Sequence, residues 1–518
     1  MKIGLGINIF SNNFLNPPDP QALAHFTRVT SAPNNGVIPA GLNGLNTLVK
    51  SIKSAYSTND VTSVLTAAYD PYYLGYKLGA GSGDALTQGT STLYSLCGSD
   101  SDVTQGTTTA QPLFLNHDGT NNYWFSNGIS NMAVFSDNSA TVAGNISLEI
   151  IVRLSLNILS GTEATIISKL ASNSGFRINY DASTDRIKFY KNASNVSSSA
   201  TLTSAGITVH TPFFLKVTSV ASTGLTQIFT STNGVTYTQL GTDLSITTGN
   251  FLDPAGKRIG IAADVTSATA STSALKGKIY SATVATSING TPVVNFNANG
   301  YPKTTAAYTT STTWVASTGE TWTINIGAGN IVGNNYNSIL VHRSMLIGNG
   351  TSNFLENTTL TRSAQLTQYL AFAGFNNTPN GGSANTLDSL GVIRSNSIEQ
   401  SSTTAMRAAV NGTGGGLITD GATTITKISP VLGLATFNVR AGTTPYSTAL
   451  VNNILAKTDN VNRSPVTSTG LRILRGGSGA GLYAPSAISS VFISKAVDSA
   501  GIQTSMYNII RGLNNNVF

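Results

Sequence analysis

From about residue 69 to its end, the chain consists of short apolar runs separated by turn residues. In residues 176–192 (FRINYDASTDRIKFYKN), apolar and polar residues alternate on both sides of a polar turn, as they do in a β-hairpin. Two further hairpins are expected to turn at Asn233-Gly234 and Asn289-Gly290, because tight hairpin turns require positive φ angles. Several hairpins at regular spacing favour an antiparallel β-sandwich over parallel α/β units.

The composition agrees with this fold class and sets the number of domains. A chain of 518 residues is too long for one typical hydrophobic core, so more than one domain is expected. Charged residues make up only 10%, against roughly 25% in an ordinary soluble domain. The surface must therefore consist largely of Ser, Thr, Asn and Gly, which suit strands and turns better than helices.

The charge distribution argues against nucleic acid and membrane partners. The net charge is +7, but the 29 Lys and Arg residues are dispersed and form no basic run of the kind that nucleic-acid binders concentrate. No stretch approaches the roughly 18 apolar residues of a membrane span.

The opening MKIGLGINIF is a poor signal-peptide core. The single cysteine, Cys97, can form no disulfide within one chain.

The first decapeptide has strand periodicity without a neighbouring partner strand. A lone glycine-rich strand is unstable and is expected to add to the edge of another sheet. We therefore predict that residues 1–19 form an N-terminal docking arm, although a disordered terminus is the alternative. The predicted assembly anchor consists of Ile3, Leu5, Ile7, Ile9 and Phe10.

Residues 20–68 are the most helix-like part of the chain. Leu45, Leu48, Val49 and Ile52 recur at helical spacing, and Asp60 is placed to cap a further helix. We expect a small helical neck here, and a short helix near the C-terminus in DSAGIQTSMYNIIRGLNNN.

A similar motif occurs twice. The apolar run 113–115 is followed by Asp118-Gly119-Thr120, and the apolar run 345–347 is followed by Asn349-Gly350-Thr351. Later segments follow each copy in a similar order. The repeat predicts two sandwiches in tandem, over residues 69–310 and 311–518, with the duplicated turn at the entry of an early strand into each.

These segments resemble a known family. YYLGYKLGAGSG, STLYSLCGSDSD and LFLNHDGTNNYW, followed by GFRINYDASTDRIKFY, TPFFLKVTSV and GKIYSATVA, resemble the strands of concanavalin A-like (laminin G-like) jelly-roll domains in the expected order. The match is good over residues 69–305 and looser over 325–518, where Asn349 replaces the Asp. The resemblance implies a mainly β protein with two tandem antiparallel jelly-roll sandwiches, preceded by the helical neck and the extended arm.

The turn that begins at Asp118 is the most conspicuous candidate site. In a functional interpretation, Asp118, Asn122, Tyr123 and Trp124 present hydrogen-bonding groups and aromatic faces to a carbohydrate. In the alternative, which the repetition favours, the Asp-Gly pair makes a turn and the aromatic residues fill the sandwich.

Cofactors and metals are not indicated by the sequence. Some laminin G-like domains hold Ca²⁺, and the scattered aspartates Asp100, Asp102, Asp181, Asp185 and Asp264 would be available for it. No Asp-x-Asp-x-Asp loop gathers them, however, and a Ca²⁺ site needs six or more oxygen ligands. The histidines His25, His117, His210 and His342 share no metal-ligand spacing.

Catalysis is not predicted either. Glycoside hydrolysis needs two carboxylates about 5–10 Å apart. The chain has only five glutamates, and none lies in the Glu-x-Asp-x-x-Glu strand motif of hydrolases that share this jelly roll. The prediction is therefore a protein that is not an enzyme.

The whole arrangement also resembles virion structural proteins of tailed bacteriophages, which often combine a GLGI-type N-terminus, a small helical segment and tandem laminin G-like domains. This resemblance implies a head fibre, decoration protein or tail fibre made in the host cytoplasm and carried on the particle surface. Its implied partners are capsid or tail proteins contacted by the N-terminal arm, further copies of itself, and host surface glycans. The alternatives are a free polysaccharide-binding or depolymerising protein and a bacterial surface adhesin.

Overall fold

The computed structural model describes most of the chain. The described segments are residues 17–79, 89–128, 133–137, 139–156, 163–254, 256–265, 271–301, 313–325, 339–348, 352, 354–373, 384–388, 397–402, 405–410, 416–418, 425–426, 433–440, 444–459, 467–475 and 487–514. The predicted anchor residues Ile3, Leu5, Ile7, Ile9 and Phe10 lie outside these segments, as does the second turn at 349–351.

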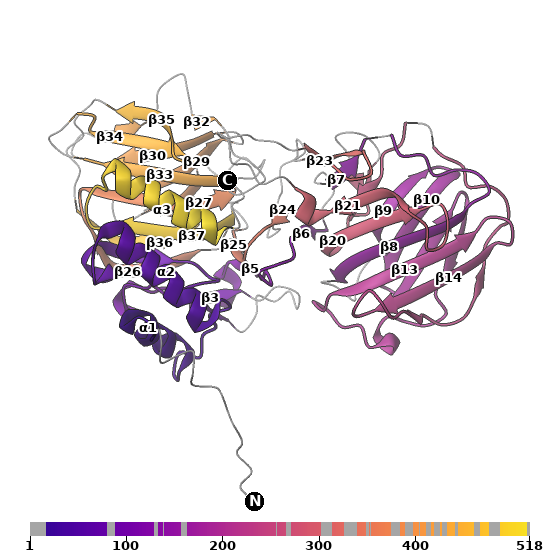
Figure 1. The fold of residues 1–518 in the computed structure, drawn as a ribbon, viewed down its shortest axis with the longest axis horizontal. Helices are drawn as coiled ribbons and strands as arrows, with labels where there is room; N and C mark the ends of the chain where they lie inside the picture. Colours follow the sequence, from indigo (N-terminus) through magenta and orange to yellow (C-terminus); the bar gives the residue numbers. More distant parts are fainter. Residues whose placement is uncertain are drawn as a thin grey trace, which may run out of the picture.

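The described residues form two lobes, each built on a pair of antiparallel β-sheets (Figure 1). The expected fold class, a mainly β protein with two antiparallel jelly-roll sandwiches, is confirmed. One lobe uses strands from residues 123–341, and we call it the inserted sandwich. The other uses strands from 65–115 and again from 345–494, and we call it the split sandwich.

The inserted sandwich consists of a nine-stranded and an eight-stranded sheet. The nine-stranded sheet has the order β15-β14-β13-β8-β20-β6-β24, with β16 on β14 and β21 on β20. Its strands are β6 (Tyr123–Asn127), β8 (Ser147–Leu156), β13 (Phe213–Val220), β14 (Leu225–Ser231), β15 (Thr238–Gln239), β16 (Leu244–Ser245), β20 (Lys276–Ala285), β21 (Pro292–Asn297) and β24 (Ile339–Val341). The eight-stranded sheet has the order β12-β11-β10-β9-β17-β7-β23-β22. Its strands are β7 (Ala133–Ser136), β9 (Glu163–Ala171), β10 (Ser174–Asp181), β11 (Arg186–Lys191), β12 (Ser194–Ser197), β17 (Gly260–Ile261), β22 (Thr313–Val315) and β23 (Thr321–Asn325).

The core of the inserted sandwich lies between these two sheets. Alternate residues of β8, among them Ile150 and Val152, are fully buried, as the period-2 pattern requires. The predicted hairpin of residues 176–192 is present as β10 and β11, with Ile178 opposite Phe189. All three tryptophans of the chain, Trp124, Trp314 and Trp322, belong to this one core. A small separate sheet pairs β18 (Asp264–Val265) with β19 (Ser271–Thr272).

The split sandwich has an eight-stranded and a ten-stranded sheet. The eight-stranded sheet has the order β35-β34-β33-β27-β37-β25-β5, with β1 also on β37. Its strands are β1 (Leu65–Tyr69), β5 (Leu113–Leu115), β25 (Met345–Ile347), β27 (Leu366–Ala373), β33 (Gly433–Val439), β34 (Ser447–Val451), β35 (Ile454–Asp459) and β37 (Ala487–Ser494). The ten-stranded sheet has the order β2-β3-β4-β26-β36-β28-β29-β30-β31, with β32 on β30. Its strands are β2 (Tyr76–Leu78), β3 (Thr90–Leu93), β4 (Val103–Thr104), β26 (Leu355–Arg362), β28 (Ala384–Asp388), β29 (Ser397–Ser402), β30 (Ala405–Val410), β31 (Gly416–Ile418), β32 (Ile425–Thr426) and β36 (Ser468–Ile473).

Three helices cover the outer face of the eight-stranded sheet of the split sandwich (Figure 1). They are α1 (Pro20–Thr30), α2 (Gly41–Tyr56) and the predicted C-terminal helix α3 (Ala500–Leu513). Leu48 of α2 and Met506 of α3 share a core with Tyr369 and Phe492, whereas Leu370 faces the other sheet. The expected separate neck over residues 20–68 is therefore corrected, because α1 and α2 form a layer of the split sandwich. Asp60 caps only a 3₁₀ turn, Val61–Ser63.

The strand pairing also corrects the expected boundaries at 69–310 and 311–518. Strands β1 to β5 complete the sheets of the split sandwich, and the inserted sandwich interrupts this unit between β5 and β25. The two similar apolar runs, 113–115 and 345–347, are not equivalent positions in a tandem repeat. They pair with each other, with Leu115 opposite Met345.

Excision of the inserted sandwich tests this connectivity. If Leu115 is joined to Met345 through an Asn-Gly turn in place of residues 116–344, β5 and β25 become a hairpin, and the shortened chain is expected to fold. The measurement is far-ultraviolet circular dichroism of the three helices during thermal unfolding, which should show one cooperative transition. Residues 311–518 alone are expected not to fold, because β37 and β25 then lack their partners β1 and β5. If the shortened chain did not fold and residues 311–518 alone did, the boundaries at 69–310 and 311–518 would be correct.

Candidate functional site

The turn at Asp118 lies where the chain passes between the two lobes. Asp118 is exposed, and its carboxylate accepts hydrogen bonds from the backbone N–H of Thr120 (2.8 Å) and of Asn121 (2.7 Å). Gly119 has a φ of +87°, and a Cβ placed there would stand 2.5 Å from the Tyr72 hydroxyl. The positive φ favours glycine at this position, and a side chain there would displace the Tyr72 hydroxyl.

The other three candidate residues of this turn are buried. Trp124 is fully buried in the core of the inserted sandwich. Tyr123 faces the opposite side of β6, where its hydroxyl donates to the carbonyl of Asn116 (2.6 Å), and Asn122 is 7% exposed. The carbohydrate hypothesis for these residues is corrected, because the aromatic faces are covered by the protein itself. The alternative, a turn followed by core aromatics, describes the structure.

Buried polar groups fill the joint between the lobes. The His117 backbone N–H donates to the Ser344 hydroxyl (3.0 Å), and its Nε2 lies 3.1 Å from the Asn122 side-chain oxygen. Burial lowers the pKa of His117 to about 4, so the ring is neutral at pH 7. Burial likewise lowers the pKa of Lys278 to about 8, and its ammonium nitrogen lies 4.6 Å from the Tyr123 ring centre.

Arg343 anchors the returning segment to the helical layer. Its guanidinium group donates to the carbonyl of Leu513 at the end of α3 and to the Tyr73 hydroxyl (3.3 Å), and it lies 4.7 Å from the Tyr72 ring centre. The side chain is only 5% exposed. A buried cation with several fixed partners is costly to displace, so this contact fixes the joint.

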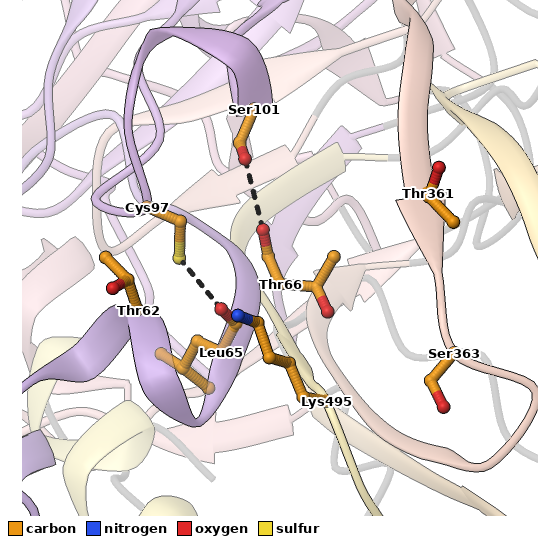
Figure 2. Close-up of a pocket in the computed structure, with 8 residues that line it drawn as sticks. All are labelled: Thr62, Leu65, Thr66, Cys97, Ser101, Thr361, Ser363 and Lys495. Carbon is orange, nitrogen blue, oxygen red and sulfur yellow. Dashed lines mark hydrogen bonds between the residues drawn. The ribbon is translucent and has the colours of Figure 1, made fainter.

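Two open clefts lie on another part of the split sandwich, and we describe them as the candidate functional site. The larger, the Lys495 cleft, has a volume of about 400 Å³ (Figure 2). It is lined by Thr62, Leu65, Thr66, Cys97, Ser101, Thr361, Ser363 and Lys495. The smaller, the Asn357 cleft, has a volume of about 270 Å³ and is lined by Asp102, Thr104, Gln105, Gly106, Glu356, Asn357, Thr358 and Thr359.

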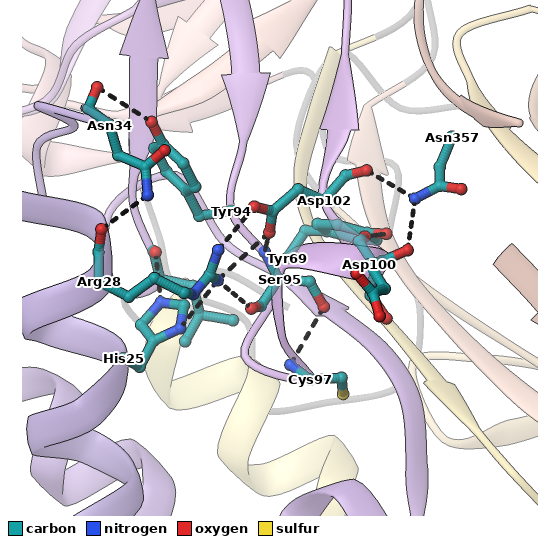
Figure 3. A network of polar contacts seen from close by, with 12 residues as sticks. His25, Arg28, Asn34, Tyr69, Tyr94, Ser95, Cys97, Asp100, Asp102 and Asn357 are labelled. Atoms are coloured by element: carbon teal, nitrogen blue, oxygen red, sulfur yellow. Dashed lines mark hydrogen bonds and ion pairs between the residues drawn. The ribbon is translucent and has the colours of Figure 1, made fainter. Parts of the chain in front are cut away.

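The loop of residues 95–102 contributes to both clefts and is held by α1 (Figure 3). The Arg28 guanidinium of α1 donates to both carboxylate oxygens of Asp102, at 2.6 and 3.3 Å, and to the carbonyl of Ser95 at 2.7 Å. Asp102 also accepts from the Ser95 backbone N–H (2.7 Å), which closes the loop upon itself. A bidentate Arg–carboxylate pair has fixed geometry, so the loop has a defined shape.

The same loop is tied to the sheets on its other side. The Asn357 amide of β26 donates to the carbonyls of Asp100 and Asp102, both at 2.8 Å, and the Tyr69 hydroxyl donates to the carbonyl of Ser101 (Figure 3). His25, whose Nε2 contacts the carbonyl of Leu74 at 2.8 Å, lies beside Arg28, and burial lowers its pKa to about 4. The network serves to position the loop that separates the two clefts.

Cys97 lines the Lys495 cleft but is not an activated nucleophile. Its thiol lies 3.5 Å from the carbonyl of Leu65, and burial raises its pKa to about 12. A reactive cysteine requires a stabilised thiolate, which a raised pKa excludes at neutral pH.

The described glutamates are occupied by structural contacts. Glu163 accepts from Lys188 (2.9 Å), Glu356 from Arg472 (3.1 Å), and Glu320 from the Asn295 backbone N–H (2.6 Å). Glu149 is buried and accepts from the Asn289 backbone N–H (3.3 Å). The side chain of Glu399 lies outside the described residues.

The predicted aspartates for calcium are dispersed in the same way. Asp181 and Asp264 pair with basic residues, and Asp185 accepts from Tyr180 and from the Thr203 backbone. Asp100 and Asp102 lie in the loop between the clefts. Within the described segments, no group of three or more His, Cys, Asp or Glu residues could hold a metal ion. The helices of these segments include none that is long and apolar enough to cross a membrane.

Comparisons with known proteins give structural matches only. No protein-family model matches the chain, and neither does any curated protein. Among solved structures it is similar to mouse laminin alpha1 domains LG4-5 (10% identity, 74% of this chain and 91% of that chain, TM-score 0.27). It is also similar to a SAP-like pentraxin from Limulus polyphemus (14%, 32% and 77%, TM-score 0.25) and to the receptor binding domain of botulinum neurotoxin type G (11%, 32% and 43%, TM-score 0.23).

Substitution of Trp124 distinguishes a core residue from a ligand-binding one. Trp124→Ala should lower the free energy of unfolding by about 3–5 kcal/mol, because it leaves a cavity in the core. Trp124→Phe should cost less, since the indole N–H has no hydrogen-bond partner in the described structure. The measurement is urea unfolding followed by fluorescence of the remaining tryptophans, which all report on the inserted sandwich. Val235→Ala, at a side chain that is 83% exposed, is the control and should have little effect. An unchanged stability in Trp124→Ala would contradict the core assignment.

The thiol of Cys97 should be unreactive. Because its pKa is raised to about 12, the thiolate fraction at pH 8 is small, and alkylation by iodoacetamide should be at least about a hundredfold slower than that of glutathione. The rate should increase with pH throughout the range in which the protein stays folded. In urea, where burial is lost, the same cysteine should react at an ordinary rate. A fast reaction of the folded protein would show that the thiol is activated.

Proposed function

We propose that this chain is a non-enzymatic structural protein of a tailed-bacteriophage particle, a fibre or decoration protein that holds its two sandwiches away from the particle surface. The proposal rests on the fact that two segments of the chain, and not one, connect the lobes. The segments 116–122 and 342–344 cross together and are hydrogen-bonded to each other, and His117, Asn122 and all of 342–344 are buried at the joint. A module on one flexible linker pivots freely, whereas one held at two adjacent points keeps its orientation.

The use of charge supports the same proposal. The chain has 22 acidic residues, and the described carboxylates mostly pair with basic groups or close turns. Enzymes that cleave glycosidic bonds need two carboxylates kept available to the substrate. Glu163 and Glu356 pair with basic residues, and Glu149 and Glu320 are buried, so none of the four presents a free carboxylate at the surface, which favours binding and assembly over catalysis.

The low surface charge fits a particle exterior. With 10% charged residues, the surface is hydrated mainly by Ser, Thr and Asn side chains. Such a surface stays in solution without attracting nucleic acid or small ions. Partners are expected among capsid or tail proteins and further copies of this chain, and the sandwiches are proposed to meet host surface glycans.

The proposal is tested by mass spectrometry of purified virions from the source, with copy number measured relative to the major capsid protein. Tens to hundreds of copies per particle are expected for a fibre or decoration protein. Absence from washed particles would overturn the structural role and favour a free polysaccharide-binding or depolymerising protein.

The role of the N-terminal arm can be tested separately. Deletion of residues 1–16 should abolish incorporation into particles and leave the lobes folded, because Asp19, which caps α1 and pairs with Lys53 at 2.8 Å, remains in place. Incorporation is measured by immunoblot of purified particles, and folding by the thermal transition of the isolated chain. The second variant is Ile7→Asp, which alters the predicted anchor without shortening the chain. A C-terminal deletion of equal length cannot serve as a control, because it would remove α3. Normal incorporation of both variants would show that the anchor lies elsewhere.

A further inference from the structure

The Lys495 cleft is assembled from four separate parts of the chain. The first part is the 3₁₀ turn with Thr62 and the start of β1 with Thr66, and the second is the loop between the clefts with Cys97 and Ser101. The third is the end of β26 with Thr361 and the next residue but one, Ser363, and the fourth is Lys495, directly after β37. Its volume of about 400 Å³ lies within the range of roughly 300–1,000 Å³ that is typical of small-ligand sites. The loop that forms one wall is fixed by Arg28 and Asn357, so this wall is preformed.

One cation and no carboxylate line this cleft. The Lys495 side chain reaches toward Leu65 and Cys97 (Figure 2). In the described part of the chain, its ammonium group takes part in no ion pair. Asp60, whose charge also raises the pKa of Cys97, accepts hydrogen bonds from Thr62 (2.8 Å) and Gln21 (2.5 Å) and is not a lining residue. The Cys97 thiol is neutral because its pKa is raised, so Lys495 is the one charged group of the lining.

Hydroxyl groups surround the cation. Thr361 and Ser363 stand on the opposite side of the cleft from Thr62 and Cys97 (Figure 2). Ser101 donates to the carbonyl of Thr66 (3.2 Å), which leaves its oxygen lone pairs available as acceptors. Each hydroxyl can both donate and accept, as the hydroxyls of a sugar ring do. Leu65 adds an apolar surface to the lining.

We propose that the Lys495 cleft binds one hexuronic acid unit, with its carboxylate on the Lys495 ammonium group and its ring hydroxyls on the Ser and Thr side chains. A single ammonium group balances the single charge of a carboxylate, whereas a doubly charged phosphate usually meets several cations or an Arg fork. The site lies away from the Asp118 turn and goes beyond the proposed structural role. It stands whether or not the chain belongs to a particle.

The test uses the full chain and saturation-transfer NMR with four probes. Methyl β-D-glucuronide and methyl α-D-galacturonide carry both the ring and the charge, methyl β-D-glucoside carries the ring alone, and acetate carries the charge alone. We expect saturation transfer to at least one uronide, and binding of the glucoside and of acetate that is at least about tenfold weaker. Lys495→Gln should weaken uronide binding about tenfold, which corresponds to 1.4 kcal/mol. Lys495→Arg, which keeps the charge, should retain most of the binding.

Lys50→Gln is the matched control, because it removes an identical charge from an exposed position on α2. It should bind the uronides as the unaltered chain does. Lys495 is itself exposed, so its substitution should leave the thermal midpoint unchanged. The proposal is overturned if neither uronide binds at millimolar concentration, if the glucoside binds equally well, or if Lys495→Gln and Lys50→Gln have the same effect.

Discussion

The architecture depends on a two-stranded antiparallel ribbon that runs through both lobes. One run of the ribbon is β5 followed by β6, and the other is β24 followed by β25. Within the split sandwich β25 is the inner strand of the pair, next to β37, whereas within the inserted sandwich β6 is the inner strand, next to β20. Each run therefore contributes a strand to one sheet of each lobe, and the same two runs pair in both lobes.

The ribbon also explains why polar groups are buried between the lobes. The seven residues 116–122 lie opposite the three residues 342–344, so one run has four residues more than its partner. The four extra residues form the Asp118 turn outside the strand pair. Their backbone N–H and C=O groups have no partner in the opposite strand and must form hydrogen bonds elsewhere. The Ser344 hydroxyl, the His117 ring and the Asp118 carboxylate accept from these backbone N–H groups, and Arg343 ties the crossing to the end of α3. The conspicuous polar and aromatic residues of this turn are thus a consequence of an uneven strand pair.

The sequence was sufficient to predict the elements and the fold class, because period-2 alternation and turn residues are local signals. Hairpins such as β10 and β11, the amphipathic α2 and the C-terminal α3 follow from spacing alone. The connectivity could not be predicted in this way. The similarity between residues 113–115 and 345–347 favoured a tandem repeat, but short apolar strands that pair across one ladder also look alike. Which sheet a strand joins is decided by partners that are distant in the sequence.

The candidate site shows the same limit. Between Asp118 and Trp124, polar and aromatic residues are adjacent in the sequence, which is typical of a carbohydrate site, but the fold buries Asn122, Tyr123 and Trp124. The Lys495 cleft had no local signature, because Thr66, Cys97, Thr361 and Lys495 are brought together only by the pairing of β1 with β37 and by the loop that Arg28 holds. The segment STLYSLCGSDSD contains that loop, but its residues became informative only once their partners from β26 and β37 were in place.

The interrupted connectivity has a consequence for the order in which the chain can acquire its structure during synthesis. All strands of the inserted sandwich are complete once residue 341 has emerged, so that lobe can close while translation continues. The split sandwich forms later, because β1 and β5 have no partner strands until β25 and β37 have been synthesised. Until then, the apolar faces of β1, β5 and α2 remain uncovered on the ribosome. A folded inserted sandwich holds residues 116 and 344 close together. The two parts of the split sandwich then lose less conformational entropy when they pair, so the apolar faces are covered sooner.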